Sequence, residues 1–224
     1  MKPIILILLF AVCRSFAIYD TNIFALGQWS EPVKTEFGHT IRGRLLICDT
    51  PDHASAGQRS VDRAVYLELQ EYSASFCPVR VNCGLHGSGL PDELNGLRCE
   101  LRDSAGNLLP KLKNFGTGGA GPSNSWVTLD PYCSIRLRAS LYSGDSILED
   151  GGLLIILAPS TVWEVYPNPN TDYYLSGTFT CEALPKVIVP RNVAHLWGFV
   201  NPTNMEIWYG TLTLPPVKIP MKKP

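Results

Sequence analysis

The feature that most constrains this chain is a repeated alternation of apolar and polar side chains with a period of two residues. Successive side chains of a β-strand point to opposite faces of a sheet, so this alternation is typical of strands packed on one face and wet on the other. In residues 40–47, Ile41 and Leu45 share one face, whereas Arg42 and Arg44 share the other. The same pattern predicts strands at residues 65–70, 79–85, 97–102, 127–129, 135–138, 175–181 and 212–214.

Two segments depart from strict alternation. Residues 153–157 form an unbroken apolar run, which predicts a strand covered on both faces. Residues 60–72 could instead place Val65 and Tyr72 on one helical stripe, but Glu68 interrupts that stripe. We therefore predict a strand for the second half of this segment.

Turn residues separate the predicted strands. Residues 103–107 carry Gly106, which can adopt a positive φ, and they predict a hairpin. Residues 167–170 have the Pro-Asn composition of a second turn, and the glycine-rich residues 113–125 predict a long loop.

Together these patterns predict an all-β fold, an antiparallel β-sandwich of two packed sheets with long irregular loops. Residues 18–216 form one domain in this prediction, followed by a basic tail at residues 217–224. The alternative is two domains divided near residues 159–170. The charged fraction of 17% lies below the usual ~25%, which suits a turn-rich exported β protein.

Residues 1–17 are predicted to be a secretory signal peptide. Lys2 supplies the positive charge that precedes the apolar segment at residues 4–12. Ser15 and Ala17 are small residues at the two positions that signal peptidase recognises. Nine apolar residues span only ~14 Å as a helix, so we expect no permanent membrane anchor. The alternative, lipidation at Cys13, is disfavoured because a large valine precedes it. The expected location is secreted, periplasmic or at the cell surface.

The charge of the chain argues against nucleic acid as a partner. The 19 basic residues less Lys2 and Arg14 leave 17 against 20 acidic residues, a net charge of −3 after the leader is removed. Three lysines in the last seven residues form the main basic cluster, and a solvated tail explains them.

Six cysteines follow the leader, and an even number in an exported chain predicts disulfides. Six cysteines allow 15 pairings, so the connectivity stays open. The alternative is that they are buried free thiols. Four of them share the inward parity of neighbouring apolar residues, whereas Cys48 does not. The disulfide candidates are Cys48, Cys77, Cys83, Cys99, Cys133 and Cys181.

No catalytic motif supports an enzyme. Asp49, Asp52 and His53 have the composition of a polar turn. Ser88 lacks the glycine two positions earlier that a nucleophile elbow requires, because His86 stands there. A hydrolase with an unrecognised site would have to join His53 or His86 to a carboxylate or serine.

One acidic loop is a candidate metal site. Asp145, Glu149 and Asp150 precede two glycines, and oxygen-rich extracellular loops can bind calcium with low affinity. The spacing fits no EF-hand, so a solvated turn is the alternative. No other cofactor is expected.

Aromatic residues are the main candidates for ligand binding. Exposed aromatic rings on a sheet can stack on sugars or anchor a protein interface. We predict a secreted, non-enzymatic module with a structural or protein-interaction role, whose partner is an extracellular protein or carbohydrate. The alternative of a carbohydrate-binding module requires the tryptophans to be exposed. The candidate ligand-binding residues are Trp163, Tyr166, Tyr173, Tyr174 and Trp208.

Overall fold

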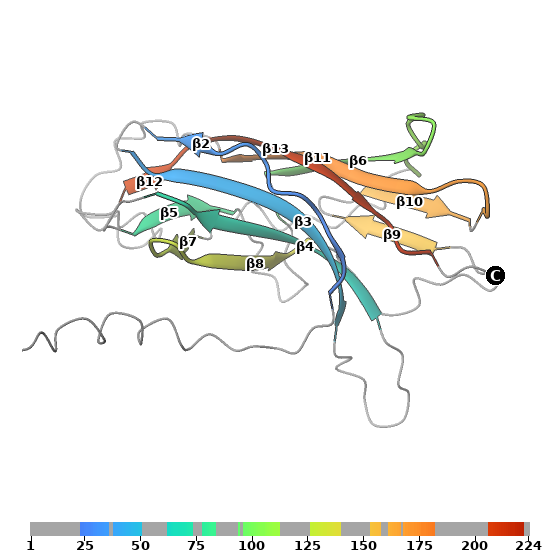
Figure 1. Ribbon diagram of the computed structural model, residues 1–224, viewed down its shortest axis with the longest axis horizontal. Helices are drawn as coiled ribbons and strands as arrows, with labels where there is room; N and C mark the ends of the chain where they lie inside the picture. The colour runs from blue at the N-terminus through green and yellow to red at the C-terminus, as the bar shows by residue number, and fades with distance from the viewer. Residues whose placement is uncertain are drawn as a thin grey trace, which may run out of the picture.

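The computed structural model describes residues 23–35, 38–50, 62–73, 78–83, 94, 96–112, 126–139, 153–157, 161–166, 168–181 and 206–221. Regular structure in these ranges is β-strand without any helix, which confirms the all-β class (Figure 1). Within the same ranges, no helix has the length and apolar character needed to cross a membrane. The strands are β1 (Ile23–Leu26), β2 (Val33–Lys34), β3 (Thr40–Thr50), β4 (Asp62–Glu71), β5 (Val79–Asn82), β6 (Leu97–Asp103), β7 (Trp126–Leu129), β8 (Ser134–Arg138), β9 (Leu153–Leu157), β10 (Thr161–Val165), β11 (Tyr173–Cys181), β12 (Glu206–Trp208) and β13 (Gly210–Lys218).

The largest sheet is antiparallel and has the order β1-β3-β4-β8, with β2 also pairing β3. In its register Leu45 lies opposite Leu67, and Leu67 lies opposite Leu137. All three are buried, as the alternation of their sequence predicts. The neighbouring residues of each strand therefore point to the opposite, outer face of this sheet.

Three smaller sheets complete the described structure. They have the orders β13-β11-β6, β12-β5-β7 and β10-β9, and the pair β5–β12 is parallel. The chain passes from one sheet to another at two short connections. Residues 130–133 join β7 to β8 of the largest sheet, and Tyr209 alone separates β12 from β13.

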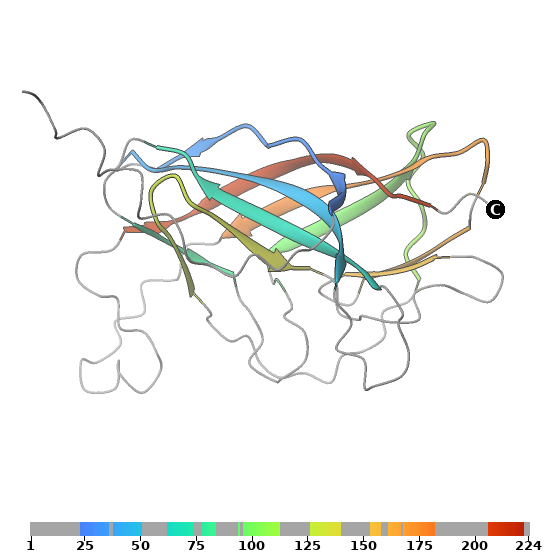
Figure 2. The ribbon, with the colours of Figure 1, turned by 60° about the horizontal axis from the view of Figure 1, so that its bottom comes forward.

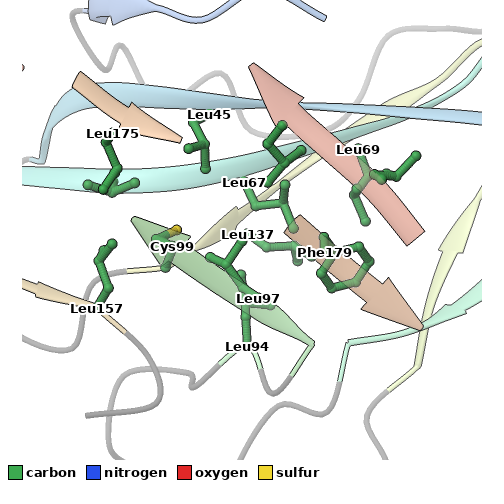
Figure 3. Packing of buried hydrophobic residues seen from close by; sticks show 14 of the residues in the cluster. Leu45, Leu67, Leu69, Leu94, Leu97, Cys99, Leu137, Leu157, Leu175 and Phe179 are labelled. Atoms are coloured by element: carbon green, nitrogen blue, oxygen red, sulfur yellow. The ribbon is translucent and has the colours of Figure 1, made fainter. Parts of the chain in front are cut away.

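The sheets share one hydrophobic core, to which most of the strands contribute. In Figure 2, β3 and β4 pass across β11 and β6. Figure 3 shows Leu67, Leu137 and Phe179 gathered together, and Phe179 also stacks on Trp208 with ring centroids 6.4 Å apart. A Cβ atom added at Gly43 of β3 would lie 3.0 and 3.1 Å from two leucine side chains of β13. The inner face of the largest sheet therefore packs directly against β13.

Several local predictions agree with this structure, whereas the tail predicted at residues 217–224 overlaps β13, and Val217 and Ile219 are buried in the core. The segment with a helical alternative forms β4, and the apolar run at residues 153–157 forms β9. The turn at residues 103–107 is closed by a hydrogen bond from Gly106 N to the Asp103 carbonyl, and Gly106 has φ 86°. The leader at residues 1–17 and the loop at residues 113–125 lie outside the described residues.

The structure differs from the disulfide prediction, because no disulfide joins Cys48, Cys83, Cys99, Cys133 and Cys181. Cys77 lies outside the described residues. The register explains part of this result, since none of these cysteines that lies within a strand faces another across the sheet. The cross-strand neighbours are Ala64 and Ile23 for Cys48, Gly177 for Cys99 and Gly210 for Cys181.

The inward cysteines agree with the alternative of buried thiols. Cys83, Cys99 and Cys181 belong to the hydrophobic core, with at most 5% of their surface exposed. Burial raises the pKa of all three thiols, that of Cys99 to about 12 and that of Cys181 to about 11. Since the thiolate is the reactive form, these side chains are chemically inert in the folded protein.

Candidate functional site

The two tryptophans expected at a ligand surface lie in the core. Trp163 of β10 and Trp208 of β12 are both 0% exposed. Trp208 packs on the Phe179 ring, and the ammonium group of Lys111 lies 5.6 Å from the centre of the Trp163 ring. A ligand arriving from solvent cannot stack on either ring, so these residues do not form the expected aromatic strip.

The three candidate tyrosines lie near the connection between β10 and β11. Tyr166 is 45% exposed, and its hydroxyl donates a hydrogen bond to the Glu164 carboxylate. The Tyr173 hydroxyl donates to the Tyr166 carbonyl across 3.1 Å, and Tyr174 is half-buried. The hydroxyls of Tyr166 and Tyr173 are thus engaged within the protein, which leaves the Tyr166 ring as the exposed element of this group.

The remaining candidates cannot be placed. Asp145, Glu149 and Asp150 lie outside the described residues, as do His53 and His86. Among the side chains that the structure does describe, no group of three or more His, Cys, Asp or Glu residues could hold a metal ion.

The outer face of the largest sheet carries polar side chains beside the buried Leu46, and sequence reasoning did not single out this face as a site. The register of β3, β4 and β8 aligns them in three cross-strand rows. The rows are Arg42–Gln70–Ser134, Arg44–Glu68–Arg136 and Leu46–Tyr66–Arg138. Four arginines and one glutamate therefore share these rows, which gives the three rows a net positive charge although the whole chain carries −1.

Two aromatic rings pack among these arginines and form a cation–π ladder, defined as Tyr72, Arg42, Trp29 and Arg44. The Arg42 Cζ atom lies 4.2 Å from the centre of the Tyr72 ring and 4.6 Å from that of Trp29. The Arg44 Cζ atom lies 4.1 Å from the same Trp29 ring. All three distances are within the ~6 Å over which a guanidinium is attracted to a ring face.

Backbone hydrogen bonds place the ladder on the sheet. Tyr72 N donates to the Thr40 carbonyl, so Tyr72 lies beside the start of β3. Ser30 N donates to the Gly43 carbonyl, so Trp29 lies between the levels of Arg42 and Arg44. The backbone of Tyr72 and that of Trp29 therefore lie at different levels along β3, and both rings contact the Arg42 guanidinium.

Glu68 neutralises two of the arginines. Its carboxylate accepts a hydrogen bond from Arg44 Nε at 2.6 Å and one from Arg136 Nε at 3.1 Å. The Glu68 side chain is only 4% exposed beneath these two guanidinium groups, whereas Arg136 is 40% exposed. Such a shielded charge is stable because it is paired and hydrogen-bonded. Arg42 instead gives its Nε hydrogen to the neutral Gln70 carbonyl at 2.8 Å, so its charge is not neutralised by this glutamate.

A second cluster lies at the C-terminal end of β4, around Glu71, which is 0% exposed. Its carboxylate accepts hydrogen bonds from the Ser73 hydroxyl, from Ser73 N at 3.2 Å and from Tyr132 N at 3.1 Å. His39 Nδ1 lies 3.4 Å from the same carboxylate. Burial alone would raise the pKa of Glu71, but these hydrogen bonds outweigh it and hold the pKa below its ordinary value.

This cluster fastens the connection between β7 and β8. Tyr132 has φ 61°, a left-handed conformation that costs a non-glycine residue about 1 kcal/mol or more. The bond from its N–H to Glu71 holds the backbone in that conformation, at the point where the chain crosses between sheets. The Glu71 cluster therefore has a structural role at this corner.

The same geometry argues against a serine nucleophile. In a serine–histidine–acid arrangement the hydroxyl donates to the imidazole, which in turn donates to the carboxylate. Here the Ser73 hydroxyl donates to the carboxylate itself. His39, Glu71 and Ser73 are also at most 7% exposed, so a substrate has no access to them from solvent.

A sequence signal for both clusters was present in the parity of the strands. His39 has the same inward parity as Ile41, and Glu71 has that of Leu67 and Leu69. Strand parity therefore indicates that both ionisable side chains face the core. The outward parity of Arg42 and Arg44 was recognised, but their neighbours across the sheet depend on a register that local pattern does not supply.

Comparison with known proteins gives no relative from which a role could be transferred. No protein-family model matches the sequence, and searches of the curated proteins and of the solved structures found no significant match.

Proposed function

We propose that the protein is an exported, non-enzymatic β-sandwich module that binds another protein through the outer face of its largest sheet. The observation that carries this proposal is the ladder of Tyr72, Arg42, Trp29 and Arg44 on that face. Tyrosine, tryptophan and arginine are the residues enriched at the energetic centres of protein interfaces.

The sandwich is supported by the packing across the core. The inner face of the largest sheet meets β13 at Gly43, and β13 belongs to the sheet of β11 and β6. Leu212 and Leu214 of β13 alternate with exposed threonines in the same way that the inward Ile41 and Leu45 of β3 alternate with arginines. Two antiparallel layers that bury their apolar faces against each other have this pattern.

Export is supported by the predicted leader at residues 1–17, with its positive start and apolar segment. A binding role is supported by the contrast between the two polar clusters. The Glu71 cluster is enclosed and structural, whereas Tyr72 on the outer face is 53% exposed and Arg136 is 40% exposed.

The test is a capture experiment with matched tyrosine variants. The immobilised mature protein is incubated with the secreted and surface proteins of the cells that produce it, and the bound proteins are quantified by mass spectrometry. We expect Tyr72→Ala to lose the specifically bound protein, and Tyr166→Ala to retain it. Tyr166 is a close control because it is 45% exposed but belongs to the connection between β10 and β11.

Carbohydrate binding would give a different result. Electrophoresis through gels containing cellulose derivatives, chitin derivatives or alginate detects it as retardation. Retardation that Tyr166→Ala abolishes and Tyr72→Ala leaves intact would favour the carbohydrate-binding alternative. A bound protein set that Tyr72→Ala does not change would refute the proposed interface.

A further inference from the structure

We propose that Arg42 is a preorganised receptor for a carboxylate, and that the outer face binds an acidic side chain, aspartate or glutamate, of the partner protein. This inference rests on the proposed function and identifies the chemical group that the interface recognises. It concerns the outer edge of the Arg42 guanidinium, the edge formed by its two Nη atoms.

The Arg42 guanidinium is held in place by two aromatic rings. The Tyr72 and Trp29 rings both contact it, with ring centres 4.2 and 4.6 Å from Cζ. An arginine in water has many rotamers, and ordering such a side chain on binding costs ~0.5–1.5 kcal/mol. In this structure that ordering is already complete before a ligand arrives.

The Nε–H group of the Arg42 guanidinium is already hydrogen-bonded. Arg42 Nε donates to Gln70 Oε1 at 2.8 Å, which fixes the rotation of the group about its long axis. Neither Nη atom of Arg42 has a hydrogen-bond acceptor among the described residues. Among the described residues, the four N–H groups of the two Nη atoms therefore have no acceptor. One N–H from each Nη atom forms the outer edge, which can bind a planar oxyanion through two parallel hydrogen bonds.

The charged side chains around the two Nη atoms also favour an anion. In the three cross-strand rows Glu68 is the single carboxylate, and Arg44 and Arg136 both donate to it. Among the described residues, no carboxylate pairs with Arg42, which lies beside two aromatic rings. An anion bound there gains an ion pair without displacing an existing one.

These features favour a carboxylate of a protein over a polyanion. A sulfated polysaccharide or nucleic acid gains affinity from many unpaired cations along its length. Here Glu68 already engages two of the four arginines, and the exposed Tyr72 ring offers an apolar contact next to the free edge. A charge that contacts two aromatic rings can accommodate a single acidic side chain within a protein interface.

The experiment measures the Arg42 side chain directly. NMR of the mature protein labelled at its arginine side chains is recorded during titration with a short synthetic peptide that contains Leu-Glu-Leu, and with its Leu-Gln-Leu counterpart. We expect the glutamate peptide to shift the Arg42 resonances saturably and the glutamine peptide to leave them unchanged. Arg42→Lys keeps the charge but loses the planar fork, and it should weaken binding of the glutamate peptide about tenfold.

Two further measurements make the result decisive. Arg102→Lys is the control, because Arg102 belongs to β6 in another sheet and is paired with Glu100. Tyr72→Ala removes one stacked ring at an exposed position, so it should fold and still weaken the glutamate peptide. Equal binding of both peptides, shifts confined to Arg102, or tighter binding of a sulfated disaccharide would each overturn the carboxylate assignment.

The outcomes also separate this inference from the proposed function. If Tyr72→Ala loses the captured protein while Arg42→Lys keeps it at full strength, the interface stands and the carboxylate receptor is refuted. If neither substitution changes capture, the proposed interface itself is refuted.

Discussion

Replacing Glu71 by glutamine should strongly destabilise the protein, because this carboxylate accepts backbone hydrogen bonds on both of its oxygens. Ser73 N donates to Oε1 and Tyr132 N donates to Oε2. A glutamine has one carbonyl oxygen and one NH₂ group, so one of these two buried N–H groups must face another donor.

The size of the effect follows from those contacts. A buried donor without an acceptor costs ~1–3 kcal/mol, and replacing the remaining charged acceptor by a neutral one costs ~1 kcal/mol more. We therefore expect Glu71→Gln to lower the free energy of unfolding by ~2–4 kcal/mol. For a domain of this size that corresponds to a fall in Tm of ~4–16 °C.

Thermal unfolding followed by circular dichroism measures this fall, with Glu100→Gln as the control. Glu100 is also a hydrogen-bonded glutamate, but its side chain is 50% exposed and its ion pair with Arg102 is on the surface. Such a pair is worth ~0–1 kcal/mol. Equal Tm values for the two variants would refute the structural role assigned to Glu71.

The pH dependence gives an independent check. Because the pKa of Glu71 is lowered in the folded protein, its contribution to stability is complete above the unfolded value of 4.5. That contribution is lost as the pH falls through the folded pKa. The difference in stability between the wild type and Glu71→Gln should therefore shrink in acid, and a difference that grows on acidification would contradict the argument.

The other predictions concern the glycines and the buried thiols. Gly177→Ala should destabilise by about 3 kcal/mol in urea unfolding, because the new Cβ would lie 2.3 Å from a backbone oxygen of β6. Gly43→Ala should cost only about 1 kcal/mol, since it meets leucine methyl groups at 3.0 Å or more, and a larger cost than Gly177→Ala would contradict this packing. Cys83, Cys99 and Cys181 should resist alkylation at pH 8 until the protein is unfolded, which mass spectrometry detects; rapid labelling of the folded protein would refute their burial.

Strands and their buried faces could be predicted from the sequence because side-chain parity is a local property. Leu45, Leu67 and Leu137 all face the core as alternation requires. The assignment of each strand to a sheet could not be predicted, since it depends on pairing between distant segments. Residues 130–133 look like an ordinary hairpin turn, but β7 and β8 on either side of them belong to different sheets.

The site was harder to predict than the fold because an aromatic side chain suits both a core and an interface. Trp163 and Trp208 are buried, whereas the Trp29 ring packs against Arg42 and Arg44 of the outer face. Only the register shows that Trp29 packs between Arg42 and Arg44. Composition and spacing therefore predicted that aromatic residues matter without identifying which of them are accessible.

Two glutamates of β4 show how one strand can serve both stability and recognition. Positions 68 and 71 differ by an odd number of residues, so their side chains point to opposite faces of the sheet. Glu71 faces inward and fixes the corner that brings β8 beside β4, which in turn places Arg136 opposite Glu68. Glu68 faces outward and engages Arg136 and Arg44, whereas no carboxylate among the described residues pairs with Arg42, which contacts two aromatic rings. The accessible charge of the outer face thus depends on a buried carboxylate on the other side of the same sheet.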